Sequence, residues 1–74
     1  MNKKEMKNII TSIAEVVKRF SWDIKDVYIK EYCIYAVVKN EYTVKEEGLF
    51  AGSQELREDV ENIYYELKEI FVTN

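Results

Sequence analysis

The chain has 74 residues, of which 47% are hydrophobic and 14% aromatic, and its eleven Lys and Arg against fourteen Asp and Glu give a net charge of −3. This length predicts one domain, residues 1–74, and the apolar content excludes an intrinsically disordered chain. Histidine is absent and there is one cysteine, which excludes an internal disulfide, the usual zinc ligand sets and histidine-based catalysis.

Residues 2–20 are predicted to form a helix. Asn2 and Glu5 have the spacing of a capping box, in which each side chain satisfies the backbone N–H of the other residue. Apolar residues then recur every three or four positions and so share one face: Met6, Ile9, Ile10, Ile13, Val16, Val17 and Phe20. The pattern breaks at residues 21–23. No apolar block has the length of a signal peptide or a membrane span, so we expect a cytoplasmic protein without a membrane partner.

Residues 24–47 are rich in β-branched and aromatic residues, which favours strands. Residues 26–39 could form one strand or two, and we expect two, joined near Lys30-Glu31. A tight turn at Asn40-Glu41 precedes a short third strand that begins at Tyr42. Gly48 and Gly52 are predicted to bracket a loop.

Residues 53–71 are predicted to form a second helix with Ser53 as its N-cap. Its apolar residues step by four, three, four and three along one seam: Leu56, Val60, Ile63, Leu67 and Ile70. The element order is therefore helix, two or three antiparallel strands, helix. With both helices on one face of the sheet, the fold class is an α+β two-layer sandwich.

Nothing in the sequence predicts an enzyme. The two glycines, Gly48 and Gly52, form no phosphate-binding loop, and a thin two-layer domain has little room for a catalytic cleft. Cys33 is the one candidate nucleophile, but a cysteine within an apolar strand typically behaves as a small hydrophobic residue. We expect no catalytic residue, no metal and no cofactor.

Charge is distributed unevenly along the chain. Residues 1–20 carry a net charge of +3, residues 21–52 carry −2 and residues 53–74 carry −4. The acids of the second helix run beside its apolar seam as an acidic stripe, and an aromatic residue lies near them. These candidate partner-binding residues are Glu55, Glu58, Asp59, Glu61, Tyr65, Glu66 and Glu69. The stripe is either a solvated helix face or a surface that docks into a basic groove of a partner protein.

The second predicted strand supplies another candidate surface. If Ile34, Ala36 and Val38 face the helices, then Cys33, Tyr35 and Val37 face the other way, because side chains alternate along a strand. Both sets are mostly apolar, which suggests that the second face is also covered. The cover would be a second copy in a homodimer, another partner, or the loop around Leu49 and Phe50.

The first helix has a basic cluster at each end: Lys3, Lys4, Lys7, Lys18 and Arg19. The helix–three strands–helix order also resembles, in outline, the double-stranded-RNA-binding domain, which would imply RNA binding. Acidic residues 53–59 stand where that family has its basic cluster, and the sequence pI is near 5.0. Both observations argue against direct binding of nucleic acid.

The whole profile resembles that of small phage- or mobile-element-encoded proteins that inhibit an enzyme by occupying its surface. We therefore expect a non-catalytic inhibitor or adaptor that presents the acidic stripe to a basic protein that handles nucleic acid. The first alternative is a homo-oligomeric structural or regulatory protein that associates through Cys33, Tyr35 and Val37. The second is a weak nucleic-acid-binding domain that uses the basic first helix.

Overall fold

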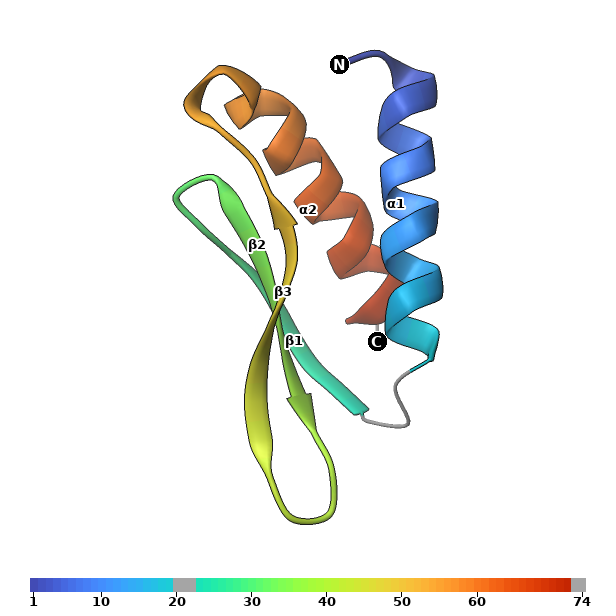
Figure 1. Cartoon of the computed structure of the whole chain (residues 1–74), viewed down its shortest axis with the longest axis vertical. Coiled ribbons are helices and arrows are strands. Elements are labelled where there is room, and N and C mark those ends of the chain that lie inside the picture. Colours follow the sequence, from blue (N-terminus) through green and yellow to red (C-terminus); the bar gives the residue numbers. More distant parts are fainter. Residues whose placement is uncertain (20–22, 73–74) are drawn as a thin grey trace.

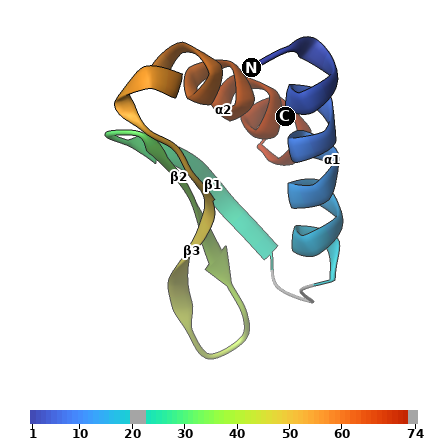
Figure 2. The same ribbon diagram turned by 45° about the horizontal axis from the view of Figure 1, so that its top comes forward.

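The structure is a computed structural model that describes residues 1–19 and 23–72. Its elements, in chain order, are helix α1 (Lys3–Lys18), strands β1 (Asp23–Lys30), β2 (Cys33–Lys39) and β3 (Val44–Ala51), the 3-10 turn η1 (Gln54–Leu56) and helix α2 (Arg57–Phe71). The strands form one antiparallel sheet in the order β1-β2-β3, and both helices lie on the same side of it (Figures 1 and 2). The predicted α+β sandwich is confirmed, with three strands.

Helix α1 begins at the predicted capping box. Asn2 Oδ1 accepts a hydrogen bond of 2.8 Å from the backbone N–H of Glu5, and the Asn2 side-chain amide donates one of 2.8 Å to the Glu5 carboxylate. The return bond therefore reaches the side chain of Asn2, whereas a capping box would use its backbone N–H. Both bonds fix the first turn of the helix.

The apolar face of α1 is fully buried only in the second half of the helix. Ile13 and Val17 are buried, whereas Val16 is 50% exposed because it lies at the edge of that face. Phe20, the last member of the predicted pattern, and the predicted break at residues 21–23 fall mostly outside the described residues, which resume at Asp23 with β1. Met6, Ile9 and Ile10 of the first half are partly buried against the same core, so α1 packs along most of its length.

Two turns connect the three strands of the sheet. Glu31 and Tyr32 join β1 to β2, and Glu31 has φ 57°, in the left-handed region that residues with a Cβ seldom adopt. In the second turn, Asn40 Oδ1 accepts hydrogen bonds from the backbone N–H groups of Tyr42 (2.8 Å) and Thr43 (2.7 Å). Tyr42 is therefore part of the turn, and β3 begins at Val44, two residues later than predicted.

The prediction of a loop between Gly48 and Gly52 was wrong, because β3 continues to Ala51. Ile34 pairs with Phe50 and Tyr35 pairs with Gly48, so Leu49 is the extra residue of a β-bulge. A bulge accommodates a glycine without ending the strand. As a result Leu49 and Phe50 pack against the core on the helix side of the sheet, not on its outer face.

The start of the second helix also differs from the prediction. Ser53 precedes the 3-10 turn and makes no side-chain cap, and α2 itself begins at Arg57. The Ser53 hydroxyl instead donates to the carboxylate of Glu55. Its backbone oxygen accepts a 3.1 Å hydrogen bond from the N–H of Leu56, which closes the turn.

The core lies between α2 and the sheet, with α1 closing one side. Its buried hydrophobic residues are Ile13, Val17, Val27, Ile34, Ala36, Val38, Val60, Ile63 and Leu67. In the predicted seam of α2, the three middle members are fully buried, but Ile70 is 47% exposed. Phe71 and Val72 pack against the core at that end of the helix instead.

Candidate binding surfaces

Helix α2 turns one side to the core and the opposite side to solvent. Val60, Ile63 and Leu67 mark the buried side. With 3.6 residues per turn, positions 58, 61, 65 and 69 fall on the opposite side. Their side chains are Glu58, Glu61, Tyr65 and Glu69, and Glu55 lies just before them in the 3-10 turn. These five residues are referred to below as the outer acidic face.

The outer acidic face is strongly negative. Its nearest cation is Arg57, whose Nε lies 3.7 Å from Glu61 Oε1 in an exposed pair that contributes little to stability. The backbone N–H of Glu55 and then the Ser53 hydroxyl donate hydrogen bonds that lower the pKa of the Glu55 carboxyl. Glu55 is therefore charged at neutral pH, and the face retains most of its negative charge.

Tyr65 stands at the centre of this face. It is 64% exposed, and its ring leans against that of Tyr64 with 5.3 Å between the ring centroids. Tyr64 is held in turn by Lys68, whose Nζ donates a 3.1 Å hydrogen bond to the Tyr64 hydroxyl. That bond raises the pKa of Lys68, and Asp26 of β1, 3.9 Å away, adds to the effect. Tyr65 is thus an exposed aromatic ring that packs on a second tyrosine, and that tyrosine is held in place by a hydrogen bond.

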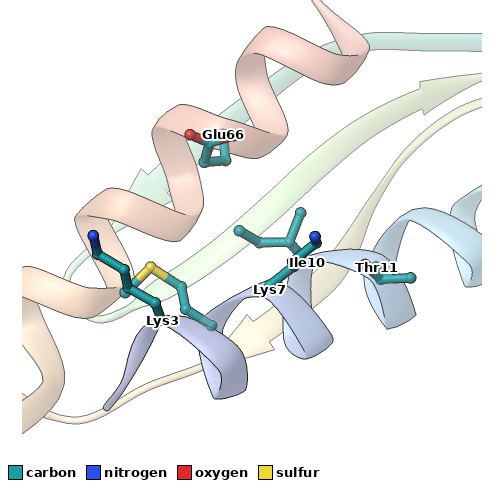
Figure 3. A pocket seen from close by; sticks show the side chains of 6 residues that line it. Lys3, Lys7, Ile10, Thr11 and Glu66 are labelled. Atoms are coloured by element: carbon teal, nitrogen blue, oxygen red, sulfur yellow. The ribbon is translucent and has the colours of Figure 1, made fainter.

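The two other acids of the predicted stripe face helix α1. Asp59 Oδ2 lies 3.1 Å from the N-terminal ammonium of Met1. Glu66 lines a hollow of about 410 Å³ between the helices, together with Lys3 and Lys7. Figure 3 shows Glu66 on α2, with the two lysines, Ile10 and Thr11 on α1. The structure therefore brings five of the seven predicted residues together and places Asp59 and Glu66 among positive charges.

The outer face of the sheet, away from both helices, is the second surface. Ile34, Ala36 and Val38 are buried, which places Cys33, Tyr35 and Val37 on the outer side. These three side chains are half-buried by their neighbours. In the described part of the chain, no element covers this face (Figure 2).

An aromatic pair that the sequence reasoning missed dominates this outer sheet face. Tyr28 of β1 is the register partner of Tyr35 of β2, and their rings stack with centroids 5.4 Å apart. The Tyr28 hydroxyl donates a hydrogen bond to the carboxylate of Glu46 of β3. Alternation along the strands could have placed the two tyrosines on one face, but only the register could make them neighbours.

The Tyr28 hydroxyl is expected to lose its proton at a higher pH than an ordinary tyrosine. Its hydrogen bond to Glu46 is the main cause that raises the pKa of Tyr28 to about 12, and partial desolvation adds to it. Because this pKa exceeds the unfolded value of about 10, the related stabilisation is present below pH 10 and is lost as the pH rises towards 12. Ultraviolet titration of tyrosinate, compared with Tyr28→Phe to identify the signal, measures this pKa. Glu46→Gln should return it towards 10, and an unchanged midpoint would contradict the assignment.

The sequence predictions also concern metals, Cys33 and membranes. Among residues 1–19 and 23–72, no three His, Cys, Asp or Glu side chains form a group that could hold a metal ion. Cys33 is half-buried at the start of β2. No helix in the described part of the chain is long and apolar enough to span a bilayer. Comparison with protein-family models, curated proteins and solved structures finds no match.

Proposed function

We propose that the protein is a non-catalytic inhibitor or adaptor that presents the outer acidic face of α2 to a basic surface of a partner protein. A protein that handles nucleic acid offers such a surface. The observation that carries the proposal is the placement of three glutamates and one exposed tyrosine on the side of α2 opposite the core, with Glu55 of the preceding 3-10 turn beside them.

The geometry of the face supports docking into a basic groove. From Glu58 to Glu69 the carboxylates extend over about 16 Å, because an α-helix rises 1.5 Å per residue. A row of negative charges on a rigid element can occupy positions where phosphates would lie, and opposite charge accelerates the encounter. Tyr65 adds a large, partly apolar contact of the kind that dominates binding energy at interfaces.

The basic residues of α1 give less support to the alternative function, a domain that binds nucleic acid through this helix. Lys3 and Lys7 lie beside Glu66 of α2, and the N-terminal ammonium lies beside Asp59. Positive potential at this end of the helix is therefore reduced by neighbouring carboxylates. The feature that favours a protein partner, the outer acidic face, has among residues 1–19 and 23–72 only the ion pair between Arg57 and Glu61 to offset its charge.

Capture of a partner from an extract of the host cell tests the proposal. The test variant carries Glu58→Gln, Glu61→Gln and Glu69→Gln. The control carries Glu15→Gln, Glu31→Gln and Glu41→Gln, which are exposed and lie on α1 or in the turns. Each variant removes three negative charges. The test variant should bind about tenfold more weakly or worse, and the control should bind as the wild type does.

Equal loss in the two variants would show that net charge alone attracts the partner and would overturn the proposed site. Adding Tyr65→Ser to the test variant should weaken capture further, because it removes the central contact. Capture that persists in both variants at raised salt would also contradict the proposal, since screening weakens exposed charge pairs.

A further inference from the structure

We infer that two copies of the chain pair face to face through the outer face of the sheet, with their β2 strands antiparallel. This dimer goes beyond the proposed function, because it uses the side of the sheet opposite α2. Three observations carry the inference: the surface area that the chain exposes, the side chains at the centre of the face, and the charges around them.

The chain exposes more surface than its mass predicts. Its accessible surface is 5485 Å², whereas a folded monomer of 8.9 kDa typically exposes about 4,800 Å². The difference, roughly 700 Å², is close to the ~800 Å² that each partner contributes to a standard interface. Figures 1 and 2 show that the β2–β3 hairpin extends past the helices as an arm, which leaves the sheet without a second layer there.

The strand edges are poorly suited to receive a second copy. Strand β1 has a register shift between Ile24 and Asp26, and β3 has the bulge at Leu49. Beside its bulge, β3 carries the consecutive charges Lys45, Glu46 and Glu47. Bulges and charges are the usual features that prevent edge-to-edge pairing. Of the surfaces of the sheet itself, the outer face is therefore better suited to a second copy than either edge.

The centre of the outer sheet face is suited to burial. Cys33, Tyr35 and Val37 form an apolar line along β2, and Tyr28 stacks on Tyr35. Burying a tyrosine hydroxyl is costly when it has no hydrogen-bond partner. The Tyr28 hydroxyl already donates to Glu46, so this ring can enter an interface with its polar group satisfied.

The charges at the rim select one orientation. Asp26 and Lys30 lie two residues on either side of Tyr28, on the same face of β1. A two-fold axis that crosses the strands at Tyr28 and Tyr35 places Lys30 of each copy opposite Asp26 of the second copy. An axis parallel to β2 would instead place Asp26 opposite Glu46, because both flank Val37 in the register. Like charges would then repel.

The Asp26 side chain is 51% exposed and can rotate to make this contact. In the single copy its Oδ1 accepts a 2.9 Å hydrogen bond from the Val27 backbone N–H and lies 3.9 Å from Nζ of Lys68 on α2, so the dimer would exchange these partners for Lys30 of the second copy. Exposed ion pairs contribute little affinity, but they favour one register over another. In the antiparallel dimer the two outer acidic faces point away from each other. The dimer would therefore present two binding faces and could engage two basic surfaces together.

Sedimentation equilibrium of the full chain over a wide concentration range tests the dimer. Val37→Asp should raise the dissociation constant about 100-fold, because it replaces a buried apolar contact of the interface by a charge beside Asp26 and Glu46. Val16→Asp makes the same change at an exposed position of α1 and should leave the constant unchanged. Circular dichroism checks that both variants keep the fold.

A charge swap tests the orientation. Lys30→Asp alone and Asp26→Lys alone should each weaken the dimer about tenfold, and the double variant should regain most of the loss. A wild-type chain that stays monomeric at every concentration overturns the inference, as does a double variant weaker than both single ones. The two proposals can fail separately. If the wild-type chain is a monomer, but neutralising Glu58, Glu61 and Glu69 still abolishes capture of the partner, then the dimer is wrong and the proposed function remains supported.

Discussion

Leu67→Ala is expected to lower the free energy of unfolding by about 2–5 kcal/mol, the range for removing a large buried side chain. Leu67 is fully buried in the core cluster with Val60 and Ile63. A domain of this size has a total stability of roughly 4–11 kcal/mol. The substitution should therefore remove a large share of it, as chemical denaturation would measure.

Ile70→Ala is the matched control for Leu67→Ala. Ile70 belongs to the same seam in the sequence but is 47% exposed, so its truncation should cost less than about 1 kcal/mol. The contrast distinguishes the observed packing from the predicted seam. Equal losses at the two positions would contradict the structure of this end of α2.

Gly52→Ala is expected to destabilise the fold by about 1–3 kcal/mol, through overpacking. A Cβ at Gly52 would lie 2.4 Å from a methyl group of Val60 and 2.6 Å from the backbone oxygen of Tyr32. That oxygen also accepts a 2.8 Å hydrogen bond from the Gly52 N–H, so the two segments cannot separate without losing it. Thermal unfolding should show a decrease in Tm of roughly 4–8 °C for each kcal/mol.

Gly48→Ala provides the control for Gly52→Ala. Nothing lies within 4 Å of a Cβ built at Gly48, so the change should be tolerated within about 0.5 kcal/mol. The two glycines lie four residues apart in the same part of the chain. Equal destabilisation by the two substitutions would contradict the close approach at Gly52 and leave only a general effect of glycine replacement.

The sequence predicted the order of elements because hydrophobic period is a local property. Apolar residues at three- and four-residue spacing located both helices. Segments rich in β-branched and aromatic residues located two of the strands. The third strand was misjudged because glycines usually mark loops. Its continuation depends on pairing with β2, and the bulge at Leu49 is set by that pairing. Likewise, Phe71 and Val72 pack against the core where the seam predicted Ile70, which is 47% exposed, and this depends on tertiary packing.

For the candidate surfaces, too, local sequence patterns predicted some residues, whereas others depend on tertiary packing. Helical spacing identified the acids of α2, and alternation along β2 identified Cys33, Tyr35 and Val37. Spacing alone could not show that Asp59 and Glu66 face α1, because that depends on where the first helix packs. The Tyr28–Glu46 hydrogen bond joins residues 18 positions apart and required the register of the whole sheet.

The two surfaces lie on opposite sides of one thin domain. The outer acidic face belongs to α2, and the outer sheet face lies beyond the layer on which α2 packs. A contact at one does not obstruct the other. Pairing of two copies would stabilise a domain whose own core is small, by mass action. Binding of a partner at α2 would then occur on a more stable support.

Mapping the contact surface tests the proposed function most directly. Amide resonances of the isotopically labelled chain would be recorded before and after addition of the captured partner, at low ionic strength. The largest changes are expected at Glu58, Glu61, Tyr65 and Glu69, with little change at Tyr28 and Tyr35 beyond that due to dimerisation. Changes confined to α1 or to the sheet, with the outward side of α2 unaffected, would contradict the account.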